Sequence, residues 1–77
     1  MPADPAEVVT ALRKRLPATV EVRLDDVNGR PHAVVTHDGL RETWVDLWTS
    51  TAAQPDADAS SVAEAIVQVE GWPHRAE

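Results

Sequence analysis

The fold is decided by an alternating stretch around one tight turn, residues 20–35, which read VEVRLDDVNGRPHAVV. Apolar residues recur at every second position before Asn28-Gly29 and resume after it, and such alternation is typical of strands with one buried face. Asn-Gly suits a two-residue type I′ turn, because both central residues of that turn need positive φ. We therefore predict an antiparallel hairpin of strands 19–27 and 31–37.

A third strand is predicted over residues 40–48, after a second turn signal at Asp38-Gly39. Its register depends on the length of that turn. A two-residue loop places Trp44 and Trp48 on the face that packs against the core. A three-residue loop exchanges the two faces, because side chains alternate along a strand. The set that then points inward is Thr43, Val45 and Leu47.

Two properties of this third strand favour opposite registers. Bulk favours Trp44 in the core, because Val and Ala are small and the helices supply few large side chains to fill the interior. Asp46 favours the reverse, since it shares a face with Trp44 and its carboxylate is costly to bury. We favour Trp44 inside and Trp48 half exposed near the sheet edge, which leaves Val34, Val45 and Leu47 facing outward.

Helices are predicted on both sides of the three strands. Asp4, Pro5 and Glu7 provide a cap, a first-turn proline and the capping-box glutamate of a helix over residues 4–16. The same capping spacing at Ser61 and Glu64 predicts a helix over residues 61–70 that ends at a glycine. The apolar face of this second helix comprises Val62, Ala65, Ile66 and Val69. Residues 49–59 are small, polar and acidic, and we interpret them as a flexible connector.

We therefore predict a single α+β domain over residues 1–77, with the order α-β-β-β-α. Its three strands form an antiparallel meander, and both helices pack on one face of the sheet. The other face is open to solvent or to a partner.

This order resembles that of the double-stranded RNA-binding domain, and Gly29-Arg30-Pro31-His32 is similar to the Gly-Pro-x-His motif of that family. The resemblance implies the α-β-β-β-α topology. The family contacts RNA phosphates through a lysine-rich run at the start of its second helix. The corresponding residues 59–64 read ASSVAE and contain no basic side chain.

Composition excludes several classes of function. The chain has 13 acidic and 7 basic residues, a net charge of −6, which disfavours nucleic acid and anionic membranes as partners. Without cysteine it has neither disulfides nor thiolate chemistry. Residues 1–9 lack a basic segment and an apolar run, so we expect no signal peptide and a cytoplasmic location. The abundant residue types are those encoded by GC-rich codons, whereas Lys14, Asn28 and Ile66 are each the only residue of their type. This composition indicates that the chain comes from a GC-rich bacterium or its phage.

The sequence contains no convincing catalytic or metal site. His32 and His37 are an odd number of residues apart, so they point to opposite sides of one strand and are not expected to bind the same metal ion. The serines lie in the connector or at a helix start, and the three glycines lie at turns or at a helix end. We expect no enzyme activity, no metal and no cofactor.

The sequence favours a small acidic interaction module, such as an adaptor, a modulator or an immunity-type protein. It would bind a protein partner with a basic surface, or a second copy of itself, through the open sheet face. The predicted partner-binding residues are Val34, Val45, Leu47 and Trp48. The alternative is a divergent nucleic-acid binder that uses Arg13, Lys14, Arg15 and Arg30.

Overall fold

The central sheet is a three-stranded antiparallel meander, as the sequence predicted, and its strands lie side by side in chain order. The computed structural model describes residues 3–72, and the strands in it are β1 (Val20–Val27), β2 (Arg30–His37) and β3 (Arg41–Asp46). The first hairpin is confirmed: Asn28 and Gly29 have φ of 53° and 80°. The hairpin pairs Val22 with Val35 and Leu24 with Ala33.

The second hairpin corrects the favoured register. Asp38 and Gly39 form the expected tight turn, with φ of 52° and 71°, and the Leu40 N–H donates to the His37 carbonyl at 2.9 Å. Strand pairing nevertheless begins with His37 and Arg41, so Leu40 is an extra residue between turn and strand. An added residue of this kind reverses the facing of everything that follows it.

The prediction that Trp44 lies in the core is therefore wrong. Ala33 pairs with Val45, and Val34 pairs with Trp44 on the opposite face. Val45 is buried within the core, whereas Trp44 retains 44% of its surface exposed.

The third strand ends two residues earlier than predicted, because Asp46 starts a helix. The Asp46 carboxylate accepts the Thr49 N–H at 3.2 Å and caps α2 (Leu47–Ala53). The prediction of a flexible connector is thus wrong for residues 49–53, which complete this short helix. Leu47 and Thr51 are its buried residues, on the side where α2 contacts β2.

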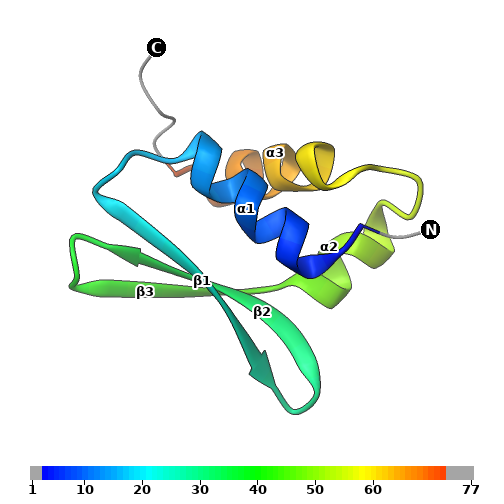
Figure 1. Ribbon diagram of the computed structural model, residues 1–77, viewed down its shortest axis with the longest axis horizontal. Coiled ribbons are helices and arrows are strands. Elements are labelled where there is room, and N and C mark those ends of the chain that lie inside the picture. Colours follow the sequence, from blue (N-terminus) through cyan, green and yellow to red (C-terminus); the bar gives the residue numbers. More distant parts are fainter. Residues whose placement is uncertain (1–2, 73–77) are drawn as a thin grey trace.

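The two longer helices confirm the predicted layers. Figure 1 shows α1 (Pro5–Arg15) and α3 (Ala59–Glu70) side by side on one face of the sheet. Asp4 caps α1 by accepting the Ala6 N–H at 2.9 Å, as expected. In α3 the cap is Asp58, which accepts the Ser61 N–H at 2.8 Å, so this helix begins two residues earlier than predicted.

The face that α3 buries is rotated from the predicted one. Its buried residues are Val62, Ala63, Ile66 and Val67. Val69 was predicted to face the core but is 85% exposed, and Ala65 is only partly buried. The helix ends at Gly71, whose φ of 69° is the left-handed conformation expected there.

The hydrophobic core lies between the helix layer and the sheet. It combines one face of each helix with the inward positions of the strands, and Trp72 closes it after α3 with its ring 6.0 Å from that of His37. Its fully buried members include Val8, Leu12, Ala33, Val35, Leu47 and Val62. No helix within residues 3–72 has the length and apolar character needed to cross a bilayer.

Candidate protein-interaction surface

The sheet face away from the helices is crossed by rows of cross-strand neighbours. One row runs Arg23, Val34 and Trp44 across β1, β2 and β3. The next row, towards α2, runs Asp25, His32 and Asp46. The register shift caused by Leu40 brings Trp44 and Asp46 into these rows.

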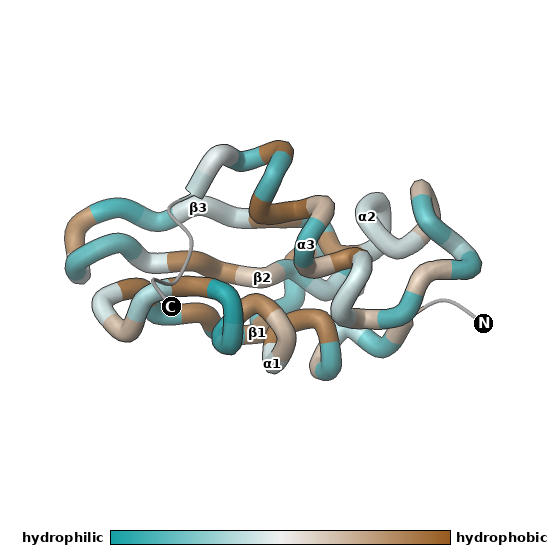
Figure 2. The backbone as a smooth tube through the Cα atoms, turned by 90° about the horizontal axis from the view of Figure 1, so that it is seen from above, coloured by the Kyte–Doolittle hydropathy of each residue, from teal (hydrophilic) through white to brown (hydrophobic). Residues whose placement is uncertain are grey.

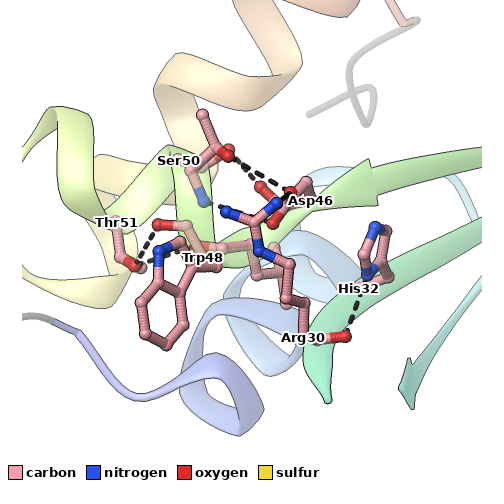
Figure 3. A network of polar contacts seen from close by, with 8 residues as sticks. Arg30, His32, Asp46, Trp48, Ser50 and Thr51 are labelled. Carbon is pink, nitrogen blue, oxygen red and sulfur yellow. Dashed lines mark hydrogen bonds and ion pairs between the residues drawn. The ribbon is translucent and has the colours of Figure 1, made fainter. Parts of the chain in front are cut away.

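Five residues at the junction of β2, β3 and α2 form what we call the tryptophan cluster: Arg30, His32, Trp44, Asp46 and Trp48. Trp48 lies in the first turn of α2 and is 56% exposed. Because β3 gives way to α2 between the two tryptophans, Trp44 is presented by a strand and Trp48 by a helix. Figure 3 shows the Arg30 side chain reaching towards both Asp46 and Trp48.

The cluster is ordered by contacts among its own members. Arg30 Nη1 lies 3.4 Å from Asp46 Oδ2, and the Arg30 guanidinium carbon lies 5.8 Å from the centre of the Trp48 ring. His32 Nδ1 is 3.0 Å from the Arg30 carbonyl oxygen, and the His32 ring is 6.3 Å from that of Trp44. These contacts connect the two tryptophans to β2 and leave both of them partly exposed.

Asp46 is the electrostatic centre of the cluster. Partial desolvation raises the pKa of Asp46, but hydrogen bonds from the N–H and hydroxyl of Thr49 lower it, helped by the charges of Arg30 and His32. The net pKa lies below the ordinary value of 3.8. The carboxylate therefore stays ionised at neutral pH, where it caps α2 and orients Arg30.

The four residues predicted to contact a partner do not gather on this surface. Val45 and Leu47 face the helices with 8% and 0% exposure, because the register is the opposite of the favoured one. Val34 does lie on the open face, but it is fully buried between its larger neighbours Arg23 and Trp44. Only Trp48 is accessible.

Trp44 was expected on the open face only in the register that was not favoured, and Arg30 and His32 were missed as members of a protein-binding surface. One signal could have identified the correct register. Asp46 followed three residues later by Thr49 is a helix-cap pattern, and a cap at Asp46 ends the strand there. That ending removes the need to bury the carboxylate, and it places Trp48 on a helix rather than on a strand.

Most basic residues of the nucleic-acid alternative are engaged within the molecule. Arg13 Nε donates to the Val22 carbonyl at 2.8 Å, and Arg15 Nε lies 3.0 Å from Glu64 Oε2. Arg30 is paired with Asp46. These contacts reduce the cationic surface that is available to a phosphate backbone.

Across residues 3–72 there is no group of three or more histidine, aspartate or glutamate side chains placed to hold a metal ion. Comparisons of the chain with protein-family models, with curated proteins and with solved structures found no match. The geometry of the tryptophan cluster therefore carries the functional argument.

Proposed function

We propose that this chain is a small acidic protein-interaction module that binds a partner protein through the tryptophan cluster. The observation that carries the proposal is the exposure of two tryptophans four residues apart, Trp44 at 44% and Trp48 at 56%, the second of them beside Arg30. Exposed apolar surface costs free energy in water, at about 25 cal/mol per Å². The same surface becomes favourable when a partner covers it.

The composition of the cluster is that of an interface centre. Tryptophan and arginine are the residues most enriched among those that dominate binding energy at protein interfaces. Here Arg30 is already paired with Asp46, and the backbone that carries Trp48 is already helical. Side chains that are already ordered lose less entropy when a complex forms.

Charge supports a basic partner. The chain has a net charge of −6, and the open face adds Glu21, Asp25 and Glu42 around the cluster. A field of this sign accelerates association with a basic surface more than it changes the final affinity. We therefore expect the association rate to fall with rising salt, while the dissociation rate changes little.

The partner can be identified by site-specific photocrosslinking in the source cells. A photoreactive residue at position 48 should yield one dominant protein adduct. The control position is Leu24, which is 45% exposed and thus as accessible as Trp44, but faces the helix side of the sheet. Equal adducts at both positions, or none at position 48, would contradict the proposal.

The purified partner then allows a quantitative test. Trp44→Ala and Trp48→Ala should each weaken binding about thirtyfold or more, which corresponds to a loss of about 2 kcal/mol. Leu24→Ala should leave affinity unchanged. A titration with duplex RNA at low salt tests the nucleic-acid alternative. Tight RNA binding that neither Trp44→Ala nor Trp48→Ala weakens would favour that alternative.

A further inference from the structure

A second apolar surface lies on the other side of β3, where the helix layer is wider than the sheet. Viewed from above, the C-terminal half of α3 extends past β3, on the side away from β2 (Figure 2). This overhang carries Val69, which is 85% exposed, beside the partly buried Ala65. Three strands thus leave part of the apolar surface of α3 without a strand beneath it.

The space under this overhang is a groove between β3 and α3. It consists of two open hollows of about 280 Å³ and 560 Å³, with Glu70 in the lining of both. We call it the β3–α3 groove. It is lined by Leu40, Thr43 and Val45 on the strand side, by Ala65, Val69 and Glu70 on the side of α3, and at the end near Val45 also by Thr49, Ser50 and Ala53 of α2.

The backbone of β3 borders this groove as an edge strand. At the opposite edge, α1 packs against β1, and Arg13 donates to the Val22 carbonyl. Among the described residues, the one side-chain hydrogen bond to the backbone of β3 comes from Ser50, at the last residue of the strand. An edge strand with unpaired N–H and C=O groups is a template for another strand.

We propose that the β3–α3 groove receives an extended segment of a partner protein, which adds to β3 as a fourth antiparallel or parallel strand. Its backbone would pair with β3, and alternate side chains would enter the groove and pack between Val45 and Val69. Those side chains would be apolar, because the groove is lined mainly by apolar residues near α2. Alternation follows from the two-residue period of a strand.

The charge of the groove favours basic residues elsewhere in the segment. Glu70 borders both hollows and Asp38 lies at the far end, while Arg41 is the one arginine or lysine of the lining. The net charge of the whole chain is also negative. A segment with alternating apolar residues and flanking lysine or arginine is therefore the complementary occupant.

A second copy of this chain fits the groove less well. In a β3-to-β3 pairing the inward positions would be Arg41, Thr43 and Val45, of which only one is apolar. Such pairing would also bring together two chains that each carry a charge of −6. The inference is independent of the tryptophan cluster, which lies on the open face.

The test uses linear peptides selected from a random display library on the full chain and then measured by fluorescence anisotropy. We expect selected peptides to alternate apolar residues and to carry lysine or arginine. Val69→Lys should weaken their binding at least tenfold. The matched control is Gln68→Lys, the same added charge on the adjacent exposed residue, which borders a different hollow beside Arg15 and should leave binding unchanged.

A second measurement does not depend on any variant. Methylating the backbone nitrogens of the peptide at one alternate set of residues should abolish binding, whereas methylating the other set should not, because only one set donates to β3. Several results would overturn the inference: no selected peptide, peptides with proline-rich or helical patterns, indifference to methylation, or equal effects of Val69→Lys and Gln68→Lys. A dimer in light scattering that Val69→Lys dissociates would assign the groove to a second copy instead.

The outcome also separates the two proposed surfaces. Peptides that respond to Trp44→Ser and not to Val69→Lys would support the tryptophan cluster and overturn the groove. The opposite pattern would support the groove alone.

Discussion

Asp46 shows how one side chain connects the fold to the candidate surface. It ends β3, caps α2 through Thr49, and pairs with Arg30 beside Trp48. Each of these contacts favours the ionised carboxylate, and this is why the pKa of Asp46 lies below its ordinary value despite partial desolvation. Asp58 behaves similarly at the start of α3, where hydrogen bonds from Ser61 lower its pKa.

The lowered pKa of Asp46 predicts an acid-sensitive contribution to stability. A carboxyl with a depressed pKa in the folded state contributes stability above its ordinary pKa of 3.8, and this contribution is lost as pH falls through the folded pKa. Asp46→Asn keeps a capping oxygen but cannot ionise. The urea midpoint of the wild type should therefore fall more steeply below pH 3.8 than that of the variant, and parallel profiles would contradict this.

Leu47 and Trp48 are adjacent in sequence but differ completely in environment. Leu47 is fully buried, while Trp48 is 56% exposed. Leu47→Ala should lower the free energy of unfolding by about 2–5 kcal/mol, the usual cost of truncating a buried leucine. Trp48→Ala should cost less than about 1 kcal/mol, as expected of a surface position. Urea unfolding measures both, and equal losses would show that residues 47 and 48 are not arranged as described.

At the level of elements, the facing of β3 depends on whether Leu40 belongs to the loop or to the strand. This leucine stands between a tight turn that is already complete and the first residue of β3, and it is 88% exposed. Leu40 therefore belongs to the loop, where it neither pairs with β2 nor contributes to the core.

Deleting Leu40 should leave the pairing of His37 with Arg41 intact, because a two-residue turn remains. We expect a change in stability within about 1 kcal/mol and unchanged tryptophan emission. The control is deletion of Thr43, which lies within β3. This deletion moves the later residues of the strand, Trp44 to Asp46, to the opposite face of the sheet. That deletion should cost at least about 2 kcal/mol, because Val45 leaves the core. Similar stability of the two deletion variants would contradict the assigned register.

The sequence predicted those elements whose signals are local. Asn28-Gly29 determined the first hairpin, Asp4 and Pro5 the start of α1, and Gly71 the end of α3. The third strand was harder, because the two apolar sets of residues 40–48 are nearly equivalent and one extra residue after a turn chooses between them. The prediction of a turn at Asp38-Gly39 was correct, but the turn residues do not show at which residue the pairing of β3 with β2 begins.

The candidate surface was predicted in its location and not in its residues. An open sheet face follows from the order of elements, but its membership depends on the register of β3 and on the onset of α2. Both were misassigned, so three of the four predicted partner contacts proved to be buried. The exposure of Val69 was also missed, since the periodicity of α3 alone does not show how far the helix extends past the edge of the sheet (Figure 2).

At the scale of the whole molecule, three helices and three strands leave apolar surface uncovered in two places. One is the tryptophan cluster on the open face, and the other is the groove under α3. Both adjoin β3, so a partner that approaches this side of the molecule meets apolar side chains within an acidic surface. This arrangement is our physical reason for proposing a binding module.

The central claim is that Trp44 and Trp48 stand exposed on a folded monomer, and iodide quenching of tryptophan fluorescence tests it most directly. Three variants that each retain one tryptophan, with phenylalanine at the other two positions, would be measured alongside light scattering for mass. We predict that Trp44 and Trp48 are readily quenched, while Trp72, which is 8% exposed, is protected. Protection of Trp44 and Trp48 in a monomer would place them in the core and contradict the account.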